Sequence, residues 1–191
     1  MDTLRRFNPW PIFLYNSRAM RGPDSKRLTW AERALLYGTP AVGFVLFVVF
    51  RLQLGGVGQL LSATSLLVGA MLSTFVFLAN LRIKIQEVED YRVRSGLKEL
   101  VASSAVGALH VSLMAMLLAL GLALMASWPL LTADSVPGNI ASGICVGLLI
   151  HLVISLAAVL RRLFGIYVDL FMGDFLAKPL PEEPQPWRTK D

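Results

Sequence analysis

The chain has 191 residues, of which 55% are hydrophobic and 16% are charged, and its formal net charge is +5 at pH 7. An average soluble domain carries about 25% charged residues. The deficit comes from four long stretches with almost no charge, each close to the roughly 20 residues that cross a bilayer. The longest stretch outside these segments is the first 34 residues, so we expect no second soluble domain of useful size.

The single cysteine, Cys145, lies inside an apolar stretch. A lone thiol excludes an intrachain disulfide and a cysteine-based zinc site, so we interpret Cys145 as a buried structural residue. The pair Arg5 and Arg6 is not followed by the apolar run of a signal peptide, because the first long apolar run begins near Leu35. We expect the N-terminal segment to remain in the mature protein.

The apolar pattern predicts an all-α integral membrane protein with four transmembrane helices. The expected spans are residues 35–54, 57–81, 101–128 and 139–160. They belong to one four-helix domain, residues 35–178. A basic and aromatic segment, residues 1–34, precedes this domain, and a proline-rich tail, residues 179–191, follows it.

The ends of the spans carry local signals. Thr29 and Glu32 have capping-box spacing ahead of the first span, and Pro40 can kink its first turns. Glycines predict a tight hairpin of the first two spans; these are Gly55, Gly56 and Gly58. Proline and glycine breakers in residues 129–138 predict a short loop between the last two spans.

Orientation follows from the basic residues. Every Lys and Arg except Arg51 lies in residues 1–34, in the connection 82–100 or after residue 160. The positive-inside rule then places both termini and the middle connection in the cytoplasm. An even number of spans independently requires the termini to share a side. We expect a multi-pass protein of a bacterial inner membrane with both ends inside.

The second and fourth helices are expected to extend into the cytoplasm. The sequence between Asn80 and Ser95 has no helix breaker and is rich in helix formers. The connection 82–100 is therefore predicted to be a helical hairpin below the membrane. Residues 163–177 predict an amphipathic helix that lies on the membrane surface or against this hairpin.

The spans lack charged and catalytic residues. No Lys, Arg, Asp or Glu occupies the middle of a span, which disfavours proton pumps, voltage sensors and most ion-coupled transporters. The sequence contains no catalytic triad, Walker A loop or zinc-protease motif. We therefore expect a protein that is not an enzyme and that uses no cofactor or metal.

Small and polar residues form a stripe along one face of the second span. They are Ser62, Ser65, Gly69, Ser73, Val76 and Asn80. Two interpretations are open. Small residues allow close helix packing in a membrane, whereas hydroxyls on one face can also line a water-filled pathway for ions.

Similar stripes occur in the last two spans and include both histidines of the chain. The third span contains Ser103, Gly107 and His110, and the fourth contains Gly143, Gly147, His151 and Ser155. His110 and His151 lie at similar depths, so they can sit at one level. Each can form a hydrogen bond between helices, or the two can line a pore or sense pH.

A four-helix chain with polar stripes rarely forms a pore alone. Symmetric assembly places one stripe from each copy around an axis. We therefore expect a homo-oligomer in the lipid bilayer, most simply a tetramer. The candidate pore-lining residues are Ser62, Ser65, Gly69, Ser73, Asn80, His110 and His151.

The whole-chain layout resembles the small membrane effectors of Hailong-type antiphage defence systems. The shared features are the basic aromatic N-terminus, the glycine turn after the first span, the serine-striped second span running into the charged segment 82–98, and the basic exit at Arg161 and Arg162. The resemblance implies an oligomeric ion channel that disrupts the inner membrane during infection. It also implies a partner nucleotidyltransferase whose single-stranded DNA products keep the channel closed.

A basic cytoplasmic face is where such DNA would bind. The candidate residues are Arg5, Arg6, Arg18, Arg21, Arg82, Lys84, Arg92, Arg94, Lys98, Arg161 and Arg162. Basic residues interleaved with aromatic ones in the first 28 residues fit a lipid interface or single-stranded nucleic acid. A second hypothesis for the whole chain is a structural or assembly subunit that packs against another membrane protein. A small transporter is disfavoured.

Overall fold

The computed structural model describes residues 9–19, 29–87, 95–132, 135–168 and 170, and these residues form helices without any strand. The elements in chain order are α1 (Trp10–Ala19), α2 (Trp30–Arg33), the π-helix η2 (Ala34–Gly38), α3 (Thr39–Val49), α4 (Val57–Glu87), α6 (Ser95–Ser127), α7 (Pro129–Thr132) and α8 (Val136–Tyr167). The all-α prediction is confirmed.

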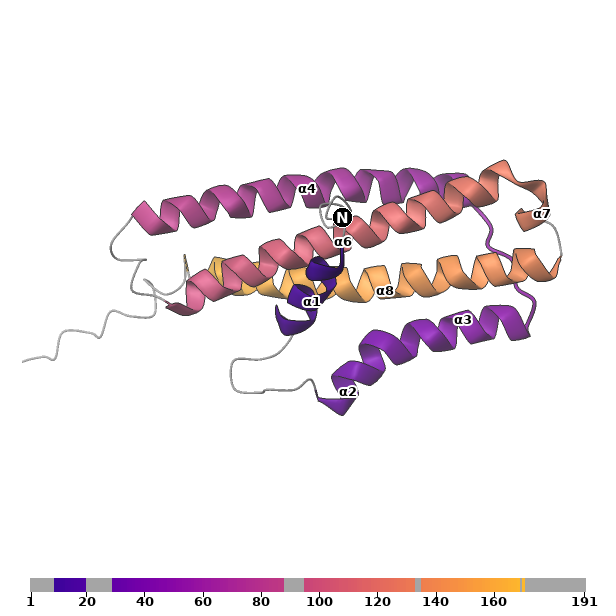
Figure 1. Ribbon diagram of the computed structural model, residues 1–191, viewed down its shortest axis with the longest axis horizontal. Coiled ribbons are helices and arrows are strands. Elements are labelled where there is room, and N and C mark those ends of the chain that lie inside the picture. The colour runs from indigo at the N-terminus through magenta and orange to yellow at the C-terminus, as the bar shows by residue number, and fades with distance from the viewer. Residues whose placement is uncertain (1–8, 20–28, 88–94, 133–134, 169, 171–191) are drawn as a thin grey trace, which may run out of the picture.

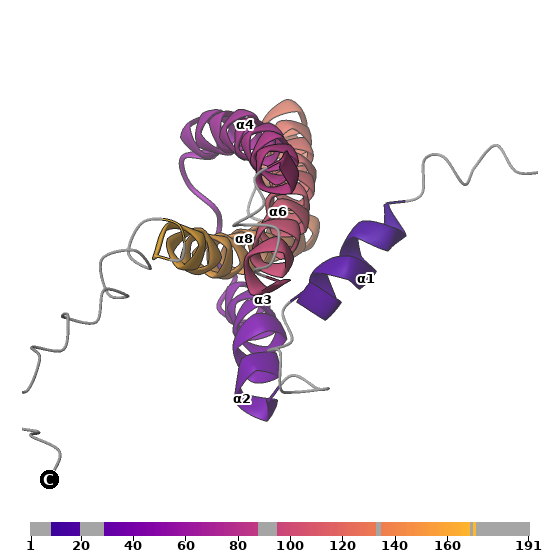
Figure 2. The ribbon, with the colours of Figure 1, turned by 90° about the vertical axis from the view of Figure 1, so that its left-hand side faces the viewer.

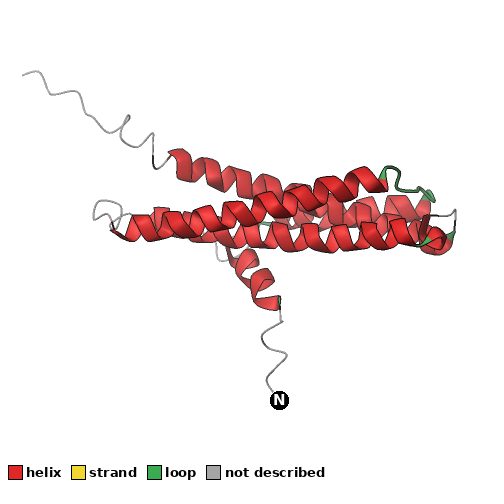
Figure 3. Cartoon of the chain, turned by 90° about the horizontal axis from the view of Figure 1, so that it is seen from above, coloured by secondary structure: helices red, strands yellow, loops and turns green. Residues whose placement is uncertain are grey.

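Four helical stretches are long and apolar enough to cross a membrane, as the sequence predicts. The first is the continuous run α2–η2–α3, Trp30–Val49, and the others are Val57–Gln86, Gly96–Ser127 and Val136–Tyr167. The long helices run side by side, and the described connections gather at one end of them (Figure 3). The predicted tail, residues 179–191, and residues 171–177 of the predicted amphipathic helix lie outside the described residues.

The long helices form a row in which α6 packs between α4 and α8, and α3 covers α8 (Figures 1 and 2). The predicted tight hairpin of the first two spans is therefore wrong. Residues 50–56 instead carry the chain across the end of the bundle from α3 to α4 (Figure 1). Gly56, with a φ of 67°, supplies the left-handed conformation at the end of this connection.

A seven-residue repeat holds the central helices together. Nine of the buried residues of α6 follow one another at alternating intervals of four and three. They are Leu97, Val101, Ser104, Ala108, Val111, Ala115, Leu118, Leu122 and Met125. Such spacing keeps one seam facing a neighbour along the whole length of a helix, as in coiled coils.

The neighbouring helices repeat the same interval. Buried residues recur every seven positions on α4 and on α8. They are Thr64, Met71, Leu78 and Ile85 on α4, and Cys145, Leu152, Val159 and Ile166 on α8. The buried position of Cys145, which is 3% exposed, agrees with its predicted structural role.

Helix α3 approaches α8 closely because α8 presents glycines to it. A Cβ atom on Gly143 would lie 3.1 Å from Phe44 Cδ2 and 3.2 Å from the Phe44 carbonyl oxygen. A Cβ atom on Gly147 would lie 3.2 Å from the Pro40 carbonyl oxygen. This is the small-residue packing expected between helices in a membrane.

Pro40, whose carbonyl oxygen faces Gly147, changes the backbone hydrogen bonding of its own helix. It has no N–H group, so the Leu36 carbonyl, four residues earlier, lacks its usual helical donor. The preceding residues form the π-helix, in which the Thr39 N–H donates to the Ala34 carbonyl. The predicted disturbance at Pro40 thus takes the form of a widened turn.

Upstream, the Glu32 carboxylate accepts from the Thr29 N–H at 2.9 Å, as the capping-box spacing predicts.

The fourth span starts earlier than predicted. Ser135 caps α8, with its hydroxyl oxygen accepting from the Gly138 N–H at 3.2 Å. Pro137 fits the first turn of a helix, where its missing N–H costs nothing. Pro137 and Gly138, which predicted a loop, therefore belong to the first turn of α8, whereas Pro129 begins the short helix α7.

A second apolar cluster joins three helices at the opposite end of the bundle. It contains Leu78 and Ile85 of α4, Leu97 and Val101 of α6, and Ile166 of α8. The described part of the segment after the fourth span thus packs against the start of the predicted hairpin. Residues 88–94 of that predicted hairpin lie outside the described residues.

Candidate functional site

The polar stripe of the second span lies on the outer face of α4. It is formed by six exposed residues that share one helical face: Ser62, Ser65, Gly69, Ser73, Val76 and Asn80. The buried series that contacts α6, including Met71 and Leu78, lies on another side of the helix. The stripe is therefore not the seam that packs within one copy of the chain.

The hydroxyl groups at the start of this face are bonded within their own helix. Ser62 donates to the Gly58 carbonyl at 3.0 Å, and Ser65 donates to the Leu61 carbonyl at 2.8 Å. The oxygen lone pairs remain available on the outer surface. Large apolar side chains border the stripe, such as Leu66, which is 77% exposed, and Phe77, which is 64% exposed.

The stripes of the other two spans are, by contrast, buried or half-buried. Gly143 and Gly147 contact α3, and a Cβ atom on Gly107 would lie 2.8 Å from Val159 of α8. Ser155 is 1% exposed. For Gly69 of the α4 stripe, no atom lies within 4 Å of a built Cβ. Packing therefore explains the α6 and α8 stripes but leaves the α4 stripe without a partner in the described part of the chain.

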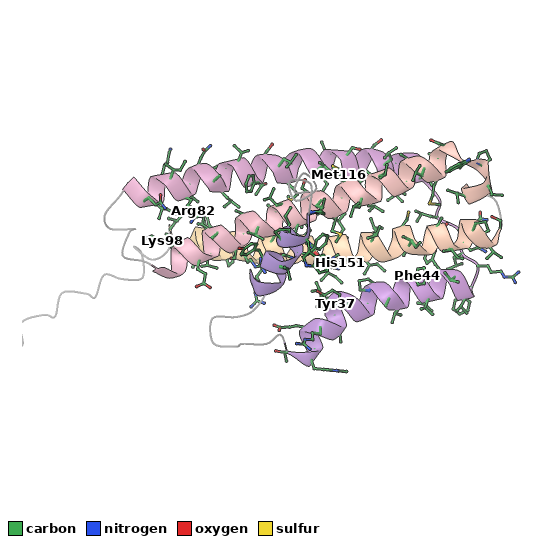
Figure 4. All side chains as sticks on the ribbon, viewed as in Figure 1. Tyr37, Phe44, Arg82, Lys98, Met116 and His151 are labelled. Atoms are coloured by element: carbon green, nitrogen blue, oxygen red, sulfur yellow. The ribbon has the colours of Figure 1, made fainter. Side chains whose placement is uncertain are left out.

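The two histidines meet at one level, as their depths predict. The Nε2 atoms of His110 and His151 lie 3.4 Å apart, and their rings are edge to face at 83°. His110 is 4% exposed. His151 lies close to the centre of α8 and faces the other helices (Figure 4).

The Leu36 carbonyl determines how protons are placed in this pair. His151 Nδ1 lies 3.2 Å from that oxygen, and a carbonyl can only accept, so Nδ1 carries the hydrogen. In a neutral ring, Nε2 of His151 is then an acceptor. The Ser155 hydroxyl lies 3.5 Å from this nitrogen, and His110 Nε2 lies 3.4 Å from it. Two acceptor nitrogens would repel each other at that distance, so His110 donates from Nε2, which leaves Nδ1 of His110 as an acceptor.

Aromatic rings continue the contact on both sides. Phe13 of α1 is edge to face with His110, with ring centroids 5.3 Å apart, and Tyr37 of η2 stacks on His151 at 6.3 Å. The histidine pair thus connects α1, η2, α6 and α8. The sequence did not predict Phe13, Leu36 or Tyr37 as neighbours of the histidines. Only the missing N–H of Pro40, four residues after Leu36, could have indicated that the Leu36 carbonyl is available.

The predicted nucleic-acid residues are only partly brought together. Arg82 of α4 and Lys98 of α6 lie at the same end of the bundle (Figure 4), and the exposed side chains of Arg82, Lys84 and Arg161 occur at that end. Arg18 lies in α1. The other predicted residues lie outside the described residues: Arg5, Arg6, Arg21, Arg92 and Arg94.

Arg162 has a partner within the bundle. Its guanidinium donates to the Ser103 carbonyl of α6 at 3.2 Å, and the side chain is half-buried. Arg162 therefore links α8 to α6, whereas Arg161 beside it is exposed. Adjacent arginines in the sequence thus have different environments.

No group of three or more His, Cys, Asp or Glu side chains that could hold a metal ion is found among the described residues. Comparisons of the chain with protein-family models, with curated proteins and with solved structures give no match. The function must therefore be inferred from the chain itself.

Proposed function

We propose that this chain is one subunit of an oligomeric ion channel in a bacterial inner membrane, with α4 facing the pore. The observation that carries the proposal is the outward position of the α4 stripe. Two of the three small-residue stripes are used for packing within one copy, and the third lies on the outer face of α4. Symmetric assembly would gather this polar face around an axis and remove it from lipid.

Helix lengths support a bundle that protrudes on one side of the membrane. The run Trp30–Val49 has 20 residues, which matches the hydrocarbon thickness. Helices α4, α6 and α8 have 31, 33 and 32 residues and are therefore substantially longer. Since α3, α6 and α8 end close together at one side while α4 begins somewhat further in (Figure 1), the excess length of the three longer helices projects at the other side.

The projecting end carries the basic residues, so we assign it to the cytoplasm with both termini. Ser62, Ser65, Gly69 and Ser73 would then lie within the hydrocarbon layer. Asn80 would lie at its cytoplasmic boundary, followed by Arg82 and Lys84. An ion pathway along α4 would therefore open into a basic vestibule.

The resemblance to Hailong-type effectors supplies a biological role for such a channel. It would permeabilise the inner membrane during phage infection, and single-stranded DNA from a partner nucleotidyltransferase would hold it closed at the basic end. Arg82, Lys84 and Arg161 support this because they expose cationic side chains at that end. We expect a tetramer as the simplest symmetric assembly.

Ion flux through liposomes that contain the purified chain tests the channel directly. We expect flux that is suppressed by single-stranded DNA oligomers added on the cytoplasmic face. Intact liposomes under every condition that keeps the protein folded would reject the channel. Co-purification of a different membrane protein in fixed ratio would instead support a structural or assembly subunit.

A further inference from the structure

A cavity lies beside the histidine pair, on the opposite side of α6 from the α4 stripe. It has a volume of about 480 Å³, is lined by α1, η2, α3, α6 and α8, and is open on one side. Its lining is mostly apolar and aromatic and includes Phe13, Tyr37, Phe44 and Met114. The volume falls within the range of small-molecule sites in proteins.

Two buried polar atoms at this cavity have no partner among the described protein groups. They are Oδ1 of Asn16 and Nδ1 of His110. Both side chains line the cavity, and they are 5% and 4% exposed. A buried polar atom without a partner is costly, so its retention at a cavity indicates a ligand that satisfies it.

Both unpaired atoms are hydrogen-bond acceptors. The Asn16 atom is a carbonyl oxygen. Nδ1 of His110 is an acceptor because its Nε2 donates to His151, whose own Nδ1 donates to the Leu36 carbonyl. A ligand that fits must therefore bring donors to an otherwise apolar space.

We propose that this cavity binds a small apolar molecule carrying a hydrogen-bond donor, such as an alcohol, phenol or indole. No Lys, Arg, Asp or Glu side chain lines the cavity among the described residues, which disfavours a phosphate-bearing or carboxylate ligand. The rings of Phe13, Tyr37 and Phe44 match an aromatic or aliphatic body. The donor of the ligand bonds Asn16, His110 or both.

This site does not depend on the channel. It lies away from the α4 face, and its walls include α1, which precedes the first span. A bound molecule would contact α1, α3, α6 and α8 together, so it would stabilise the association of α1 with the bundle.

Binding of indole and of N-methylindole distinguishes the donor from the apolar body, because methylation removes the N–H group and keeps the ring system. We would follow their fluorine-labelled forms by fluorine NMR with the full chain in lipid nanodiscs and subtract the signal from protein-free nanodiscs. The expected result is saturable binding of fluoroindole, with affinity about tenfold higher than that of its N-methyl derivative.

Variants locate the site. Asn16→Leu keeps a similar side-chain volume but removes the acceptor, and His110→Phe keeps a ring without nitrogen; each is expected to reduce the preference for the N–H compound. Met116→Leu, at an exposed position of α6 that does not line the cavity, should retain it. Equal affinities of the two compounds for the unmodified protein, or only unsaturable partitioning into lipid, would overturn the proposal even if a variant fails to fold.

Discussion

His151 donates from Nδ1 to the carbonyl oxygen of Leu36 at 3.2 Å, across the contact between α8 and η2. The sequence explains why this oxygen is available. Pro40 lies four residues after Leu36 and has no N–H group to offer it. His151 of α8 therefore supplies the hydrogen bond that Pro40 cannot give to the Leu36 carbonyl. The widened turn at residues 34–38 contains this carbonyl.

This complementarity predicts that the effects of changing Pro40 and His151 are not additive. His151→Phe removes the donor to a buried carbonyl and should reduce stability by about 1–3 kcal/mol. Pro40→Ala restores an N–H that can serve the same carbonyl within the helix, so the loss caused by His151→Phe should shrink in a Pro40→Ala background. Thermal unfolding in detergent of the four chains gives the coupling; strictly additive losses would contradict the explanation.

The two types of small-residue stripe predict opposite responses to the same substitution. Gly143→Ala places a Cβ atom 3.1 Å from Phe44 and Val48 and should destabilise the chain by about 1–3 kcal/mol through overpacking. Gly69→Ala meets no atom within 4 Å and should not destabilise one copy. Thermal unfolding of monomeric protein in detergent compares them, and equal losses would show that the face of α4 is already packed.

The proposed pore predicts that α4 is sensitive to apolar residues on its outer face. Ser65→Leu and Ser73→Leu would narrow and dewet the pathway, so ion flux in liposomes should fall by about tenfold or more. Ala63→Leu is the matched control, because Ala63 is exposed on α4 but lies away from the line of the stripe. Unchanged flux in both serine variants, or an equal decrease in the control, would remove α4 from the pore.

The fold was largely predictable because the dominant physical requirement is local. A run of about 20 apolar residues must form a helix in lipid to satisfy its own backbone, and this gives the four spans without knowledge of their neighbours. Which helices touch was not predictable. The glycines at residues 55–58 suggested a hairpin, but a turn sequence does not determine the partner, and α3 packs on the glycines of α8 instead.

The candidate site was partly predictable for the same reason. The α4 stripe follows from helical periodicity alone, and the common level of His110 and His151 follows from counting residues along their helices. The cavity was not predictable, because Asn16 reaches it from α1 through a connection that carries no pattern. The seven-residue seam of α6 was also hidden, since nearly every residue of that span is apolar or small.

The basic end predicts salt-dependent binding of single-stranded DNA. Arg82→Glu and Lys84→Glu should weaken binding of a short oligonucleotide and lower the slope of log affinity against log salt by about 0.7 for each phosphate group that the variant no longer neutralises. Arg51→Glu is the charge-matched control, because Arg51 follows α3 in the connection to α4, at the other end of α4 from Arg82 and Lys84. Fluorescence anisotropy at several salt concentrations measures both quantities, and equal effects of all three changes would indicate attraction to net charge only.

Two neighbouring arginines at the end of the fourth span are predicted to have different roles, one in stability and the other in oligonucleotide binding. Arg162 donates to the Ser103 carbonyl at 3.2 Å, so Arg162→Ala should lower stability by about 1.5–3 kcal/mol, the range for a hydrogen bond from a charged group. Arg161 is exposed, and Arg161→Ala should change stability by less than about 0.5 kcal/mol. Arg161→Ala should weaken oligonucleotide binding at unchanged stability. Thermal unfolding measures the stability of the two variants, and fluorescence anisotropy measures their oligonucleotide binding. If Arg162→Ala instead weakened binding at unchanged stability, Arg162 would be the residue that contacts phosphate.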